Sequence, residues 1–169
     1  VEKINKKYGG AKIITATNVF AHINNEPELM RNIKNLFKDD GVFISESQYL
    51  MAIVEKLEFD TIYHDHLRYY SLKPLEYLFN SFGCSLVDAE RISAAGGSIR
   101  VFAMKGKREQ SKRVKELIKE EEKMGIYDQK FWGKFKEQVI AAKNDLLTLL
   151  LQRKKKGGPI LHGPAFLFS

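Results

Sequence analysis

Two short runs of apolar, mostly β-branched residues, 11–17 and 42–47, enclose a single amphipathic segment. The first run is nearly uncharged, which is typical of a strand buried on both faces of a parallel sheet. The segment between them begins at Asn25, a good helix N-cap, and carries apolar residues at helical spacing. A strand, a helix and a second strand within about forty residues indicate a βαβ unit with parallel strands. Residues 39–41, Asp-Asp-Gly, are predicted to form the turn before the second strand.

Two more strands are predicted at residues 85–92 and 98–104, joined by a short glycine-containing connection. So short a connection makes the pair antiparallel, and the sheet is therefore mixed. Ser71 is placed to cap a helix over residues 72–82. From residue 107 onward the pattern is that of long helices. The predicted fold class is α/β with a mixed sheet, followed by a long helical arm.

Composition narrows the class of protein. A hydrophobic content of 44% over 169 residues is enough for one ordinary core. The single cysteine, Cys84, excludes a disulfide framework and fits a cytoplasmic location. No run is long and apolar enough to span a membrane, so we expect no membrane partner. The chain begins at Val1 rather than Met, and we expect a further region upstream.

The net charge of +7 permits anionic partners. The basic residues are spread along the chain and are not interleaved with aromatic residues, so we expect no nucleic-acid partner. A basic binding module remains an alternative hypothesis.

Residues 59–72 are the stretch richest in groups that can move protons or hold polar ligands, with Tyr63, His64, Asp65, His66 and Tyr69. A histidine oriented by a carboxylate is a good general base near neutral pH. The His-x-His spacing equally allows a metal site on His64, Asp65 and His66. The plainest interpretation is a polar surface loop. A tight loop or a helical turn would bring Tyr63 next to His66, whereas an extended segment would separate them.

A second polar cluster, Asn18 and His22, directly follows the first predicted strand. Ligands of open α/β sheets bind at the carboxyl ends of the strands. This placement favours a functional role for residues 59–72 over a plain surface loop. Gly96 and Gly97 are most simply a hairpin connection, and secondarily a place where backbone approaches a ligand.

Four stretches, 17–23, 41–50, 59–72 and 96–102, together resemble the ketosugar C-methyltransferases. These S-adenosylmethionine-dependent enzymes methylate a carbon atom of nucleotide-linked 4-keto deoxysugars. The resemblance implies abstraction of a proton next to the ketone, followed by attack of the enolate on the cofactor's methyl group. It also implies a nucleotide-linked ketosugar as partner and S-adenosylmethionine as cofactor.

The resemblance implies the organisation of the chain as well. Residues 1–106 are expected to be the second half of a Rossmann-like class I methyltransferase domain. Residues 107–157 would be a helical arm, and residues 158–169 the start of a C-terminal sugar-nucleotide-binding domain. The family's glycine-rich cofactor loop has no counterpart in this chain. Zinc is expected only in a cysteine-rich domain upstream, and no metal in this chain.

Site roles follow from the same resemblance. His66 is implied as the base, and Asp65 and Tyr63 as its catalytic neighbours. The implied sugar-binding residues are Asn18, His22, Tyr69, Gly96, Gly97 and Ser98, and the implied cofactor-binding residues are Asn18 and Val19. The acid is usually a glutamate, so Asp65 is one methylene shorter. Ala95 stands where the family often has histidine.

Overall fold

The structure, a computed structural model, describes residues 1–157 and divides into two compact units, Val1–Asp128 and a second unit that begins at Gln129. The first unit contains an α/β sheet, and the second contains one long helix, α6 (Gln129–Lys155). The elements of the first unit are α1 (Glu2–Tyr8), β1 (Ala11–Thr17), η1 (Phe20–His22), α2 (Glu26–Leu36), β2 (Phe37–Gln48), α3 (Leu50–Lys56), η2 (Phe59–Thr61), α4 (Leu72–Ser81), β3 (Cys84–Ile92), η3 (Ala94–Gly96), β4 (Ser98–Lys105) and α5 (Lys112–Met124).

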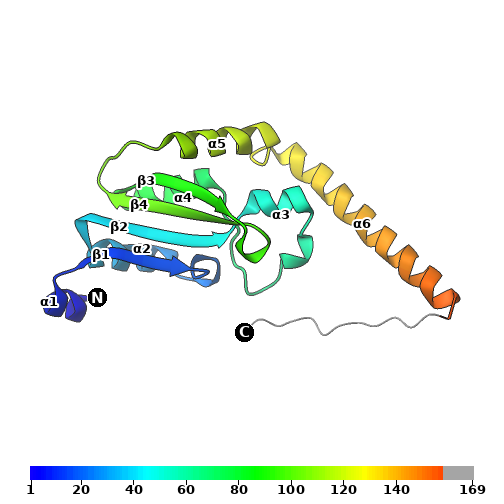
Figure 1. The fold of residues 1–169 in the computed structure, drawn as a ribbon, viewed down its shortest axis with the longest axis horizontal. Helices are drawn as coiled ribbons and strands as arrows, with labels where there is room; N and C mark the ends of the chain where they lie inside the picture. Colours follow the sequence, from blue (N-terminus) through cyan, green and yellow to red (C-terminus); the bar gives the residue numbers. More distant parts are fainter. Residues whose placement is uncertain (158–169) are drawn as a thin grey trace. The chain divides into compact units, whose positions relative to one another are not determined.

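The four strands form one mixed sheet in the order β1-β2-β4-β3 (Figure 1). β1 and β2 are parallel, with Ile13 opposite Val42 and Thr17 opposite Glu46. β4 is antiparallel to both β2 and β3. The predicted βαβ unit, the antiparallel pair and the mixed α/β class are therefore confirmed.

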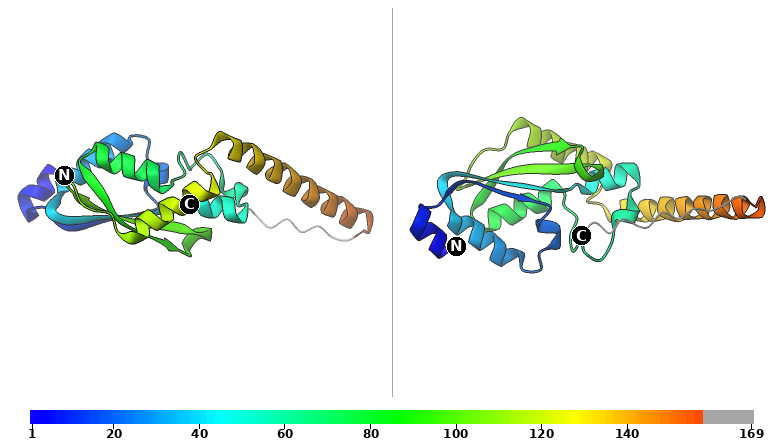
Figure 2. Two further views of the ribbon diagram at one scale, coloured as in Figure 1. Left: turned by 90° about the horizontal axis from the view of Figure 1, so that it is seen from above. Right: turned by 60° about the horizontal axis from the view of Figure 1, so that its bottom comes forward.

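Helices α2 and α4 lie on the same face of the sheet (Figure 2). α2 begins where predicted, because the Asn25 side chain accepts a hydrogen bond from the amide of Glu28. Met30 and Ile33 of α2 are buried in the same cluster as Phe43 of β2. The buried members of this core are Phe20, Met30, Ile33, Phe37, Phe43, Tyr49, Met51, Ala52, Tyr70, Leu72, Leu75, Phe79, Cys84, Leu86, Ala89, Ile99, Val101, Ala103 and Val114.

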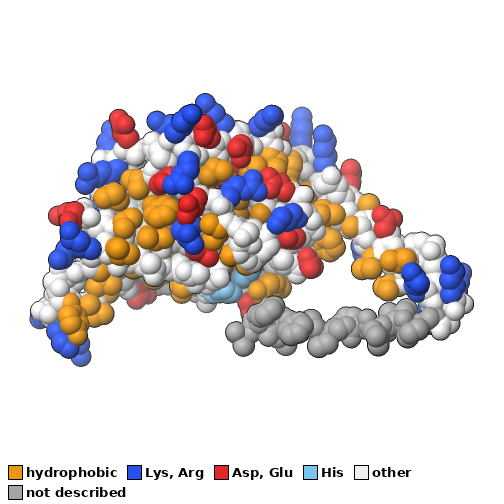
Figure 3. Space-filling view, viewed as in Figure 1, with side chains coloured by type: hydrophobic (Ala, Val, Ile, Leu, Met, Phe, Trp, Pro, Cys, Tyr) orange, Lys and Arg blue, Asp and Glu red, His pale blue; other side chains and the backbone are white. Residues whose placement is uncertain are grey.

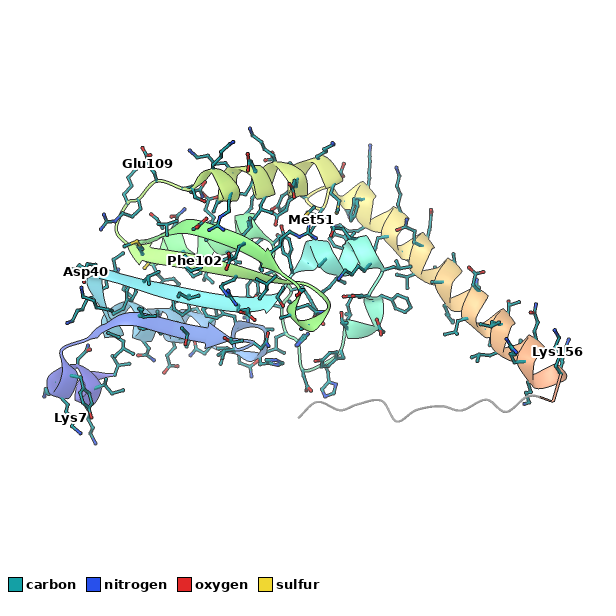
Figure 4. The ribbon with its side chains drawn as sticks, in the orientation of Figure 1. Lys7, Asp40, Met51, Phe102, Glu109 and Lys156 are labelled. Carbon is teal, nitrogen blue, oxygen red and sulfur yellow. The ribbon has the colours of Figure 1, made fainter. Side chains whose placement is uncertain are left out.

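Two predictions about the first strands are wrong. β1 is not buried on both faces, since it lies at the end of the strand order and its Ile13 side chain is 64% exposed. Residues 39–41 are not a turn, because β2 already starts at Phe37 and absorbs them as an irregularity opposite β1. Asp40 lies at the end of β2 that is remote from Met51 of α3 (Figure 4). The wrong prediction for residues 39–41 therefore does not affect the edge of the sheet where β1 and β2 end.

The capping prediction for α4 is only partly right. Ser71 is the N-cap residue, yet its side chain makes no capping hydrogen bond. α5 is capped by Ser111 and packs along β3, so it belongs to the same unit as the sheet.

In α6 the ring of Trp132 contacts the rings of Phe131 and Phe135.

None of the helices within residues 1–157 combines the length and the apolarity that crossing a membrane requires. The expected C-terminal segment 158–169 lies outside the described residues. The division of the chain at residues 106 and 157 stays a prediction.

Candidate functional site

The site is centred on residues 57–71, which connect α3 to α4 and are called the histidine loop below. α3 ends at Leu57, whose left-handed backbone (φ 55°) turns the chain away from the helix axis. The loop then folds on itself, because the hydroxyl of Tyr69 donates to the carbonyl of Thr61 at 3.0 Å. The same hydroxyl accepts the amide of Tyr63 at 3.2 Å. Hydrogen bonds within the loop thus fix its conformation.

His66 lies at the centre of an aromatic cluster. Its amide bonds to the carbonyl of Tyr63, and this turn brings the two side chains together. The Tyr63 hydroxyl is 3.2 Å from Nε2 of His66. The His66 ring also contacts the rings of His22, at 4.8 Å between centroids, and of Tyr69, at 5.5 Å. Of the two arrangements that the spacing allowed, the chain adopts the tight one, a turn in which Tyr63 and His66 are neighbours.

His22 joins the end of β1 to the histidine loop. It closes η1, directly after the strand, and its Nδ1 donates to the carbonyl of Asp65 at 2.8 Å. Because a carbonyl only accepts, Nδ1 of His22 carries a proton, and in the neutral ring Nε2 holds the lone pair. The amide of Leu67 donates to the carbonyl of Ala21 at 2.8 Å. Side chains more than forty positions apart therefore meet at one edge of the sheet. Histidine side chains are visible along the lower margin in Figure 3.

The surroundings of His66 favour its neutral form. Burial lowers the pKa of its imidazole, nearby His22 lowers it further, and Asp65 acts in the opposite direction. Nδ1 of His66 is buried and has no hydrogen-bond partner among the described residues. A neutral imidazole near physiological pH can accept a proton, which is what a general base must do.

Asp65 directs its carboxylate to the other histidine, with Oδ1 3.0 Å from Nε2 of His64. The His64 side chain is 88% exposed. In residues 1–157 no group of three or more histidine, cysteine or acidic side chains is arranged to hold a metal ion. The described residues therefore do not assemble the metal site that the His-x-His spacing allowed.

Asn18 and Val19 lie directly after β1, at the carboxyl edge of the parallel strands. Asn18 has a left-handed backbone (φ 54°), which asparagine tolerates better than most residues, and its amide donates to the carbonyl of Glu46. The chain therefore turns sharply where β1 ends and leads directly into η1 and His22.

Gly96, Gly97 and Ser98 lie at the same edge but are occupied by structural contacts. The carbonyl of Gly97 accepts the amide of Tyr49, and the Ser98 hydroxyl donates to the carbonyl of Ala94. A Cβ on Gly96 would lie 2.7 Å from a carboxylate oxygen of Glu58. The structure thus supports the simpler interpretation of a tight hairpin connection, and sugar binding by these residues stays a prediction.

Sequence reasoning missed Glu121. This carboxylate of α5 is fully buried and accepts hydrogen bonds from the Tyr49 hydroxyl and the Leu72 amide. It lies in a segment with weak apolar periodicity, where a glutamate is normally expected to face solvent. One local signal could have indicated its burial: Glu121 lies seven positions after Val114, on the same face of α5, and Val114 is buried.

With this geometry established, comparison with known proteins identifies the family. Residues 1–89 match the model of a methyltransferase domain, and residues 93–163 match that of a C-methyltransferase C-terminal domain. Residues 1–89, which include β1 and β2 of the sheet, therefore belong to a methyltransferase domain. The chain belongs to the C-methyltransferase family.

Among curated relatives, the chain is 36% identical over 127 residues to the C-methyltransferase NovU of Streptomyces niveus. That match covers 74% of this chain but only 30% of NovU. Among solved structures, the putative methyltransferase complexed with Trm112 of Haloferax volcanii has a TM-score of 0.48 at 10% identity, covering 60% of this chain and 57% of that one. Magnesium protoporphyrin IX methyltransferase of Synechocystis PCC 6803 has a TM-score of 0.44 at 10% identity. The match covers 57% of this chain and 46% of that one.

Proposed function

We propose that the full-length protein transfers a methyl group from S-adenosylmethionine to a carbon atom of a nucleotide-linked 4-keto deoxysugar. The observation that carries this proposal is the cluster of His66, Tyr63 and His22 at the carboxyl edge of a C-methyltransferase sheet. Carbon methylation next to a ketone needs a base that is unprotonated at the working pH, and the lowered pKa of His66 keeps its imidazole neutral. The sugar nucleotide as substrate follows from the resemblance of the motifs.

The described residues fit one wall of a cofactor site. Asn18 and Val19 follow β1, where ligands of such sheets bind, and the turn at Asn18 leaves the side chain of Val19 partly exposed. When bound there, S-adenosylmethionine would supply an electrophilic methyl group on a sulfonium centre. Asn18 and Val19 would hold and orient it at the strand end.

His66 is proposed to take the proton from the carbon next to the ketone. The electron pair of that C–H bond moves into the enolate and then forms the new carbon–carbon bond, while the C–S bond of the donor breaks. At rest the Tyr63 hydroxyl is hydrogen-bonded to Nε2 of His66. We propose that Tyr63 turns from His66 to the enolate oxygen as the substrate enters, because a donor is needed where the negative charge develops.

The test is replacement of His66 by alanine in the full-length protein. General-base catalysis typically contributes about 10²–10⁴-fold, so methyl transfer to a ketosugar nucleotide is expected to fall by about that factor. Exchange of the substrate's α-proton with solvent deuterium should fall in parallel, while S-adenosylmethionine binding persists. His64→Ala is the matched control, because His64 is largely exposed and contacts Asp65 instead of the cluster. Turnover of the His66 variant at the level of the His64 variant contradicts the proposed base.

A further inference from the structure

Glu121 is an unusual residue to find at the centre of a core. Its side chain is fully buried, and its carboxylate accepts three hydrogen bonds. The Tyr49 hydroxyl donates to Oε1 at 2.7 Å, the Leu72 amide donates to the same oxygen at 2.8 Å, and the Tyr127 hydroxyl donates to Oε2. Three neutral donors therefore compensate the burial of this carboxylate.

Such a network is costly if it serves packing alone. Burial raises the pKa of the Glu121 carboxyl, while the three donors and nearby Lys73 act in the opposite direction. An apolar side chain of similar volume would fill the same space without any desolvation cost. The positions of the three donors in the chain suggest a more specific role.

Two of the donors mark the two ends of the segment that consists of α3 and the histidine loop. Tyr49 immediately precedes α3, and Leu72 is the first residue of α4. The two ends also contact each other, since Tyr49 and Tyr70 form an isolated parallel bridge and the Leu50 amide donates to the carbonyl of Tyr70 at 2.9 Å. Glu121 thus holds the start of α3 and the exit of the histidine loop from a single point.

At the exit, Glu121 takes the place of a local helix cap. Ser71 occupies the N-cap position of α4 without making a side-chain capping bond, and the Leu72 amide is satisfied by Glu121 instead. A carboxylate also interacts favourably with the positive end of the helix dipole. The start of α4 is therefore fixed by a residue 49 positions further along the chain.

The exit is close in sequence to the aromatic cluster. Tyr69, two residues before the N-cap, contacts the ring of His66 and closes the loop through Thr61. If the loop ends separate, Tyr69 loses its fixed position, and water gains access to the imidazole. The lowered pKa of His66 depends chiefly on burial, so it reports on this geometry.

We propose that Glu121 is a positioning residue for the histidine loop, acting through Tyr49 and Leu72 to keep the half-buried His66 packed against His22 and Tyr69. Glu121 lies in the part of the chain that matches the C-methyltransferase C-terminal domain model, whereas the loop lies in the part that matches the methyltransferase domain. α5 would then be more than a connector, because it completes the support of the loop. The catalytic consequence rests on the proposed function of His66, but the geometric consequence does not.

The experiment is an NMR titration of His66 in the full chain carrying Glu121→Ala, Glu121→Gln or Tyr49→Phe. In Glu121→Ala the pKa of His66 should rise toward its ordinary value of about 6.5, because the imidazole becomes hydrated. Hydrogen exchange at the Leu67 amide should accelerate by about tenfold or more, the factor expected for a lost hydrogen bond to a charged group. Glu121→Gln keeps an acceptor for Tyr49 and Leu72 and should restore most of the wild-type titration. Glu120→Gln, an exposed neighbour, is the matched control and should change neither quantity.

If Glu121→Ala does not fold, Tyr49→Phe decides, since it removes the hydroxyl that ties the start of α3 to Glu121 and keeps the aromatic ring. The pKa of His66 should rise in this variant as well. Folded variants of reduced stability in which His66 titrates as in the wild type would overturn the proposal and leave Glu121 a structural residue. A different result would contradict the proposed function: an active His66→Ala enzyme, whatever the titration of the Glu121 variants shows.

Discussion

At the scale of single residues, the two adjacent histidines of the loop differ because their neighbours differ. His66 is surrounded by the rings of Tyr63, Tyr69 and His22, whereas His64 is exposed and pairs with the Asp65 carboxylate. Burial disfavours the charged form of an imidazole, and it lowers the pKa of His66. One residue type in one loop thus gives one half-buried candidate base and one solvated side chain.

The neighbours of His66 should shift its pKa in opposite directions. His22→Gln should raise it, because His22 lowers the pKa of His66 and this influence disappears. Asp65→Asn should lower it, because the stabilising carboxylate charge is lost. NMR titration of the His66 ring protons measures both, and His64→Gln serves as the control for a neighbouring loop histidine. Shifts of the same sign in the two variants would contradict this account of the site.

The same pKa determines how stability depends on pH. In the folded state the pKa of His66 lies below its value of about 6.5 in the unfolded chain. The unfolded chain therefore binds the proton more readily. Its contribution to stability is fully present above pH ~6.5 and is lost as the pH falls through the folded pKa. Urea unfolding at a series of pH values should show this loss in the wild type and not in His66→Ala.

At the scale of elements, the sequence pattern predicted the order and type of the strands and helices because their apolar periodicities are local. It failed where distant partners decide. Residues 39–41 look like a turn on their own, but pairing with β1 keeps them in β2. The burial of Glu121 depends on Tyr49 and Leu72, which are 72 and 49 positions away. The meeting of His22 and His66 could be predicted, because both follow elements that end at one sheet edge.

The connection between β3 and β4 offers a sharp test at this scale. Gly97 has φ 136°, and a Cβ there would lie 2.6 Å from the Cβ of Ala52. Gly97→Ala should therefore destabilise the chain by about 2–4 kcal/mol, the combined cost of backbone strain and overpacking. Urea unfolding monitored by circular dichroism measures the change. Gly106→Ala is the matched control, since its φ is also positive (76°) but the added Cβ meets nothing within 4 Å. A loss of about 1–2 kcal/mol is expected there, from the backbone alone.

At the scale of the whole molecule, the two faces of the sheet differ. One face is covered by α2 and α4, and the opposite face, which is turned to the viewer in Figure 3, shows apolar side chains among charged ones. Arg100 of β4 pairs there with Glu46 of β2 and Glu90 of β3, and Phe102 lies on the same face. These ion pairs lie at the surface and contribute little stability each, but they keep part of this face polar.

β1 forms the exposed margin of this face, and it has no strand neighbour beyond it among the described residues. An unpaired edge that carries an exposed apolar side chain favours association with another chain. We therefore expect the 169-residue chain to self-associate as its concentration rises, as measured by sedimentation velocity. Ile13→Lys should reduce that association, because a charged side chain on an edge strand opposes pairing. Tyr77→Lys is the control: Tyr77 of α4 is 78% exposed but lies away from the edge, so its replacement should leave the association unchanged. Equal effects of the two substitutions would show that general surface hydrophobicity, and not the β1 edge, drives the association.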